Sequence, residues 1–190
     1  MGSSAGGNIA YHAGLRAAEV VDELGPLRIR ELILHQPFCG GGAQRRGSES
    51  RNLNDPVFPL IIMDKMWDLS LPAGADLDHE YCENENCTCI LILDKYCNPT
   101  VEGGSKVLGK VKSEGWRVVV VGCEGDLLVD GQKELVKLME VKGVEMVGHF
   151  AAGGYHGMEV FDVSRAKDMF VIMTGFLLSS KPVISPTSFP

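Results

Sequence analysis

The chain has 190 residues, a formal net charge of −7 and 45% hydrophobic residues. This length and composition predict one globular unit around one core. Basic residues gather only at Arg45 with Arg46 and at Lys110 with Lys112, so most of the surface would repel a phosphate backbone and we expect no nucleic-acid partner. The sequence shows neither a charged-then-apolar leader nor an apolar run of about 18 residues, so we expect a cytoplasmic protein with no membrane partner.

The six cysteines are too few for a disulfide scaffold, and reduced thiols are the simpler expectation. Four of them, Cys82, Cys87, Cys89 and Cys97, could be drawn as a zinc site, but their spacing lacks the paired C-x-x-C of structural zinc sites. The sequence Tyr81-Cys82 recurs at positions 96–97. We therefore interpret residues 82–96 as an insertion within a single domain that covers residues 1–190.

The chain opens with Gly2-Ser3-Ser4-Ala5-Gly6, a G-x-S-x-G motif. In this motif a serine occupies a sharp turn between a strand and a helix, with its hydroxyl exposed above a sheet. Ser4 is therefore the candidate nucleophile, although a glycine- and serine-rich start is by itself more often a flexible tail. The motif needs a preceding strand and only Met1 stands there, so we expect the polypeptide to begin inside a domain.

The next residues provide the helix that the motif requires. Helical spacing predicts a helix that runs to Leu24 and is closed by Gly25-Pro26, and a buried strand follows over 30–35. Residues 37–54 are rich in Gly, Arg, Ser and Asn and predict a loop, and residues 55–71 predict a capped amphipathic helix. The apolar face expected for the first helix consists of Ile9, Ala10, Ala13, Ala17, Val20, Val21 and Leu24.

The second half of the chain alternates strands and helices. An apolar, β-branched run predicts a buried strand over 116–121, followed by a helix over 131–142, a strand over 144–150 and a closing helix over 165–178. This order predicts an α/β fold with a parallel sheet and right-handed crossovers.

Two loops that follow predicted strands carry candidate functional residues, because active sites of parallel sheets lie at the carboxyl ends of the strands. Asp126 comes first after one strand, whereas Asp130 is placed to cap the following helix. His156 lies between glycines after the next strand, and His149, inside that strand, is the weaker candidate. The order serine, acid, histidine is that of α/β hydrolases.

These residue types suit acyl transfer. A serine hydroxyl becomes a nucleophile when a neutral imidazole accepts its proton, and a carboxylate on the other ring nitrogen fixes the tautomer and stabilises the imidazolium. His12, His35 and His79 have no comparable context.

The chain resembles plant carboxylesterases of the hormone-sensitive-lipase-like group of α/β hydrolases, a group that also contains the gibberellin receptors. The resemblance rests on Gly2 to Ala10, Asn54-Asp55-Pro56, the residues flanking the insertion, Gly125 to Asp130, and Gly153 to Gly157. It implies the carboxyl-terminal portion of an α/β-hydrolase fold, with Ser4 as nucleophile, Asp126 as acid, His156 as base and the Ala5 amide as an oxyanion donor. It also implies a small-molecule ester substrate and no metal or organic cofactor; nothing in the sequence indicates the oligomeric state.

The chain departs from the family pattern in three ways. Ser3 stands where the family usually has aspartate, residues 82–96 have no counterpart, and the family's His-Gly-Gly-Gly oxyanion loop does not occur. Cys39-Gly40-Gly41-Gly42 is only superficially similar, because it follows the nucleophile and lacks the histidine. We therefore expect an impaired ester hydrolase, with a receptor-like binding protein, a dehydratase or an inactive fragment as alternatives. His156 argues against the receptor, since the receptors replace the histidine.

Overall fold

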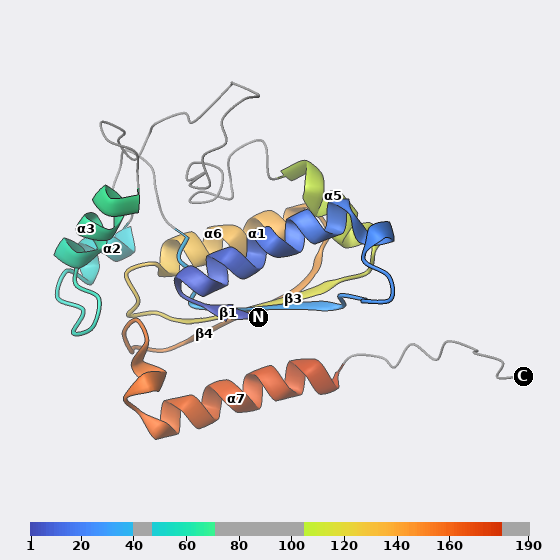
Figure 1. The fold of residues 1–190 in the computed structure, drawn as a ribbon. Coiled ribbons are helices and arrows are strands. Elements are labelled where there is room, and N and C mark those ends of the chain that lie inside the picture. Colours follow the sequence, from blue (N-terminus) through green and yellow to red (C-terminus); the bar gives the residue numbers. More distant parts are fainter. Residues whose placement is uncertain (40–46, 71–104, 180–190) are drawn as a thin grey trace, which may run out of the picture.

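The computed structural model describes residues 1–39, 47–70 and 105–179. The predicted insertion, the cysteine cluster, His79 and Gly40 to Gly42 lie outside the described residues. Figure 1 shows the fold. In chain order its elements are β1 (Gly2–Ser3), α1 (Ala5–Glu19), η1 (Val21–Glu23), β2 (Glu31–His35), α2 (Gly47–Arg51), α3 (Leu60–Ser70), α5 (Ser105–Ser113), β3 (Arg117–Cys123), α6 (Val129–Val141), β4 (Glu145–Ala151), η2 (Met158–Val160) and α7 (Val163–Leu178).

The four described strands form one parallel sheet in the order β1, β2, β3, β4, which confirms the predicted parallel α/β architecture. One register line crosses the whole sheet, because Ser3 pairs with His35, His35 with Val121, and Val121 with His149. In β3 every residue after Arg117 is buried, as an apolar, β-branched sequence in a central strand should be. The carboxyl ends of all four strands therefore meet at one edge.

Side chains of the strands alternate between two helical layers. Leu32, Leu34, Val118 and Val120 pack in the core cluster that contains residues of α1, α5 and α6. On the opposite face, Ile33, Val119 and Val121 pack against Met173 and Phe176 of α7. Figure 1 shows α7 below the sheet with α1 and α6 above it. The sheet is thus covered on both faces.

The predicted buried face of the first helix is only partly correct, because Ala10, Ala17 and Val21 pack against the core while Ile9 does not. Ile9 is 68% exposed, whereas Tyr11, Leu15 and Ala18 are buried. The helix turns a different stripe to the sheet, in which Gly14 approaches so closely that an added Cβ would overlap the side chain of Leu32. A stripe with glycine and alanine lets the helix axis lie near the strands, and this close packing outweighs the burial of Ile9.

Several predicted boundaries also shift. Helix α1 ends at Glu19 and the chain continues as the short η1, so Gly25-Pro26 does not close it directly. A short helix, α2, lies within the predicted loop over 37–54. Helix α6 begins at Val129 instead of 131, which places Asp130 in its first turn instead of at its cap.

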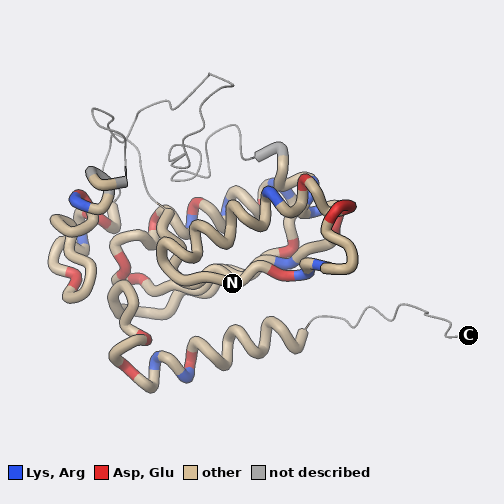
Figure 2. Tube along the Cα trace, viewed as in Figure 1, with Lys and Arg blue, Asp and Glu red and all other residues tan. Residues whose placement is uncertain are grey.

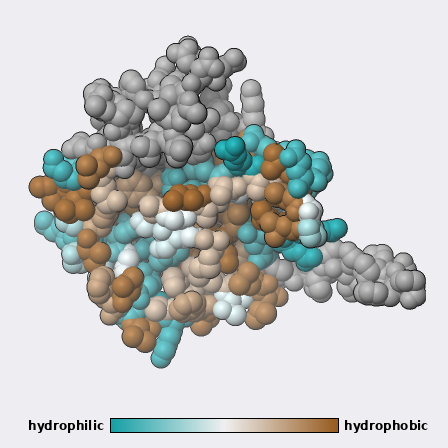
Figure 3. All heavy atoms as spheres, in the orientation of Figure 1, coloured by the Kyte–Doolittle hydropathy of each residue, from teal (hydrophilic) through white to brown (hydrophobic). Residues whose placement is uncertain are grey.

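The described surface is mixed in charge and apolar in places. Acidic and basic residues are scattered over the helices and loops, with long uncharged stretches between them, in Figure 2. Apolar groups reach the surface along α7, for which Phe170 and Val171 are 60% and 71% exposed (Figure 3). Among the described residues, no helix has both the length and the apolar character to cross a bilayer.

Candidate active site

Ser4 occupies the sharp turn between β1 and α1. Its backbone angles, φ 53° and ψ −122°, lie in a region that favours glycine, which is a strained conformation for serine. Its amide donates to the His35 carbonyl at 3.0 Å, and its own carbonyl accepts from the amides of Gly7, Asn8 and Phe38. The ends of β1 and β2 therefore hold the turn in place, as the G-x-S-x-G motif predicts.

The structure brings Ser4, His156 and Asp126 together. The Ser4 Oγ lies 2.9 Å from His156 Nε2. The other ring nitrogen, Nδ1, lies 3.0 and 3.1 Å from the two carboxylate oxygens of Asp126. Asp126 is fully buried and His156 is 6% exposed, while Ser4 is half-buried. The three side chains form a continuous chain of contacts at the carboxyl ends of β1, β3 and β4.

Asp126 is held by two further hydrogen bonds. Its Oδ1 accepts from the Leu128 amide at 2.9 Å, and its Oδ2 accepts from Gln132 Nε2 at 2.8 Å. Asp130, the alternative acid of the sequence, instead accepts from the Ser48 amide and pairs with Arg51. Its predicted role as a helix cap is wrong, because α6 starts before it and the Leu128 cap residue makes no side-chain cap bond.

Neighbouring carboxylates perturb the titration of His156. Burial alone lowers the pKa of this imidazole, but the hydrogen bond and negative charge of Asp126 raise it, and the charges of Asp55 and Glu159 add to the increase. The net pKa lies above the usual 6.5. The site therefore stabilises the imidazolium, which is the form that His156 would adopt after accepting a proton from Ser4.

The loop between β4 and η2, residues 152–157, carries His156 and is called the histidine loop here. Two residues that sequence reasoning did not assign to the site form hydrogen bonds to it. Asp55 Oδ2 accepts from the His156 amide at 2.9 Å, while its Oδ1 accepts from the amides of Val57 and Phe58. The Oε1 of Gln36, which is fully buried, accepts from the Gly157 amide at 2.7 Å. The motif Asn54-Asp55-Pro56 was a signal for the first residue. Nothing in the sequence pattern marks Gln36.

The remaining sequence candidates lie elsewhere or play other parts. Ala5 is the first residue of α1. An amide at this position has no carbonyl partner within the helix, which suits a donor to an oxyanion. The role of the Ala5 amide as an oxyanion donor stays a prediction. His149 lies on exposed β4, and His12 packs edge-on against Tyr11. The described residues contain no cluster of three His, Cys, Asp or Glu side chains that could hold a metal ion.

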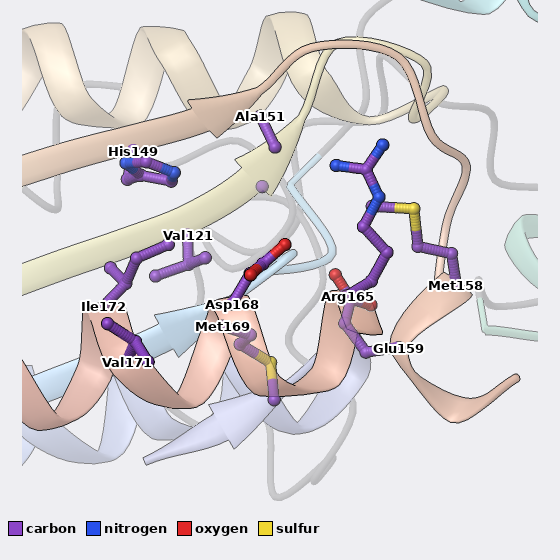
Figure 4. Close-up of a pocket in the computed structure, with 11 residues that line it drawn as sticks. Val121, His149, Ala151, Met158, Glu159, Arg165, Asp168, Met169, Val171 and Ile172 are labelled. Carbon is purple, nitrogen blue, oxygen red and sulfur yellow. The ribbon is translucent and has the colours of Figure 1, made fainter. Parts of the chain in front are cut away.

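A pocket of about 360 Å³ lies between the sheet and α7, next to η2 (Figure 4). Apolar side chains of β3, β4 and α7 line much of it, and its charged lining residues include Glu159, Arg165 and Asp168. Ser4, Asp126 and His156 are not among its lining residues.

Comparisons with known proteins agree with this architecture. A family model described as alpha/beta hydrolase fold matches residues 1–160. Carboxylesterase 20 of Arabidopsis thaliana is 47% identical over 179 residues, which is 94% of this chain and 50% of that protein. The 3-O-acetylpapaveroxine carboxylesterase CXE2 of Papaver somniferum is 41% identical over 162 residues, or 85% of this chain and 46% of that protein.

A solved fungal esterase from Rhizomucor miehei superimposes with a TM-score of 0.61 at 16% identity, over 82% of this chain and 42% of that one. At this identity the likeness bears on the fold alone. The chain spans about half the length of the curated relatives it matches. With the family model covering most of its length and a parallel sheet that carries the motif serine, the chain belongs to the alpha/beta hydrolase fold family.

Proposed function

We propose that the protein hydrolyses small carboxylic esters through an acyl-serine intermediate. The observation that carries the proposal is the 2.9 Å contact between Ser4 Oγ and His156 Nε2, with Asp126 behind the ring at 3.0 Å. This distance is within hydrogen-bond reach of a nucleophile and its base. The names of the plant carboxylesterase relatives support the same reaction class.

The proposed reaction follows from the geometry. His156 Nε2 accepts the hydroxyl proton as Ser4 Oγ attacks the ester carbonyl, and Asp126 stabilises the imidazolium that forms. His156 then returns the proton to the leaving alkoxide, so that alcohol departs and the acyl group stays on Ser4. Water, activated in the same way by His156, releases the carboxylic acid and restores the serine.

Oxyanion stabilisation limits the rate that we expect from these residues. The Ala5 amide at the start of α1 points to one donor for the tetrahedral intermediate. The 190 residues contain no His-Gly-Gly-Gly sequence, which the family resemblance associates with the other donors. Loss of one such donor lowers turnover about 10²–10³-fold, so we propose slow hydrolysis by this chain.

A fluorophosphonate probe tests the proposal directly. The full chain should be labelled, fragmentation of the labelled peptide should place the adduct on Ser4, and the same sample should release nitrophenolate from p-nitrophenyl acetate. Ser4→Ala should abolish both signals, whereas Ser113→Ala, on the exposed end of α5, should retain them. Folded protein without label or turnover would refute the proposal, and tight binding of an unreacted carboxylic acid in its place would favour the receptor-like alternative.

A further inference from the structure

A second serine–histidine–carboxylate array lies next to the candidate active site. The Ser3 Oγ is 2.8 Å from His35 Nδ1, and His35 Nε2 is 3.3 Å from Glu159 Oε1. The latter contact is within ion-pair range but is not aligned as a hydrogen bond. Ser3 and His35 occupy the same register line of β1 and β2, so their side chains lie on one face of the sheet.

This array is buried except at its serine end. His35 is 6% exposed and the Glu159 side chain 10% exposed, whereas Ser3 lies at the surface. Burial raises the pKa of Glu159, but the adjacent His35 lowers it, and the net pKa is below the ordinary value. The carboxylate thus stays charged next to the imidazole. Figure 4 shows Glu159 near the start of α7, at the edge of the pocket.

His35 also contacts the nucleophile turn through its backbone, because its carbonyl accepts from the Ser4 amide at 3.0 Å. The next residue, Gln36, contacts the histidine loop, with Oε1 accepting from the Gly157 amide and Nε2 lying 3.4 Å from the Tyr155 carbonyl. Gln36 has φ 40°, a strained value that its surroundings must impose. His35 therefore contacts the turn that carries Ser4, and the next residue, Gln36, contacts the loop that carries His156.

The serine at position 3 suits this arrangement. A hydroxyl can donate to His35 Nδ1, which leaves the ring proton on Nε2, the nitrogen that lies 3.3 Å from the Glu159 carboxylate. The aspartate that the family resemblance predicts at this position could only accept a hydrogen bond when ionised. Ser3 directly precedes Ser4, and Glu159 follows His156 by three residues. A shift at either end of the array would therefore move one partner of the Ser4–His156 pair.

We propose that His35 is a positioning residue that keeps the Ser4 turn and the His156 loop in register, acting through Ser3 at one end and Glu159 at the other. The proposal rests on the proposed hydrolysis for its kinetic consequence, while its structural consequence does not depend on activity. A misplacement of about 1 Å between reacting groups can lower a rate by up to 10²-fold, so we expect loss of either end to lower kcat about tenfold.

A double-mutant cycle gives the kinetic test. Ser3→Ala and Glu159→Gln should each lower kcat for p-nitrophenyl acetate about tenfold with KM little changed, because the proposed role of the array is to position Ser4 and His156 and not to bind the ester. The double variant should lose about tenfold and not a hundredfold, since either change already breaks the same array. Ser3→Thr, which keeps the hydroxyl, should retain kcat within about twofold. The exposed changes Ser113→Ala and Glu140→Gln serve as controls.

Losses that multiply to about a hundredfold would overturn the proposal, because two independent sites behave in that way. A rise in KM with unchanged kcat would also overturn it.

Hydrogen exchange gives a test that does not require turnover. In Ser3→Ala we expect faster amide exchange in the peptide that contains the Gly157 amide, on the far side of His35 from the substitution. Ser113→Ala should leave this peptide unchanged. Unchanged exchange in Ser3→Ala would refute the positioning role even in a sample without hydrolysis, whereas absent labelling of Ser4 with faster loop exchange would refute the proposed function alone.

Discussion

The strained backbone of Ser4 predicts an unusual difference between two substitutions. With φ 53° and ψ −122°, any residue with a Cβ is strained at this turn by about 1–3 kcal/mol, and glycine is not. Ser4→Gly and Ser4→Ala both remove the hydroxyl, so they differ in this strain. Glycine also loses more backbone entropy on folding, which costs about 0.4–1 kcal/mol. The balance favours Ser4→Gly over Ser4→Ala by about 1 kcal/mol in free energy of unfolding.

Urea denaturation followed by circular dichroism measures this difference. The denaturant slope should be the same for both variants. In a thermal melt of a chain of this length, about 1 kcal/mol corresponds to a melting temperature about 2–4 °C higher for Ser4→Gly than for Ser4→Ala. Ala13, exposed in the middle of α1, provides the matched control. There the change to glycine should destabilise the protein by about 1 kcal/mol, the ordinary penalty in a helix.

A Ser4→Gly variant that is less stable than Ser4→Ala would refute the reasoning. That result would mean that residue 4 adopts an ordinary backbone conformation in solution, and the turn would then lack the geometry that exposes a nucleophile.

Three further predictions test the site and the core. The value of kcat/KM should rise with pH through a midpoint above about 6.5, because only the neutral imidazole accepts a proton; burial lowers the pKa of His156, but Asp126, Asp55 and Glu159 together raise it more. Asp126→Asn should move this midpoint downward in a pH–rate profile. Gly125→Ala should reduce both stability and Ser4 labelling, since its Cβ would overlap the carbonyl of Gly154 in the loop before His156. Gly109→Ala, which is exposed on α5 with open space around it, should instead raise the free energy of unfolding by about 1 kcal/mol and leave Ser4 labelling unchanged within about twofold. Tyr11→Phe should leave the free energy of unfolding measured in urea unchanged or raise it by up to about 1 kcal/mol, because the buried hydroxyl has no hydrogen-bond partner among the described residues; a large loss of stability would show that the hydroxyl is bonded.

The pattern of apolar residues in short segments predicted much of the architecture. The apolar, β-branched runs around Val118 and Ile33 predicted buried strands, and their alternation with helices predicted a parallel sheet. The order Ser4, Asp126, His156 singled out three residues that the structure places in contact. These inferences succeed because a strand buried on both faces needs an apolar sequence and a parallel sheet gathers its loops at one edge.

Other features depended on how the elements pack. Helical spacing favoured burial of Ile9, but the helix turns Tyr11 and Leu15 to the sheet, because the closest approach of helix and strands requires small residues at the contact. The spacing of apolar residues indicates which face of a helix is apolar, but it does not indicate how closely the helix axis can approach a strand.

What the sequence by itself determined about this protein is therefore the kind of sheet, the order of its elements and three residues of the candidate site, all of which follow from short segments. The tertiary structure alone decided the roles of Gln36 and Asp55, and the array of Ser3, His35 and Glu159. The physical reason is that a buried polar side chain must find its partner within about 3 Å, and such partners are set by the sheet register and by loops distant in the chain.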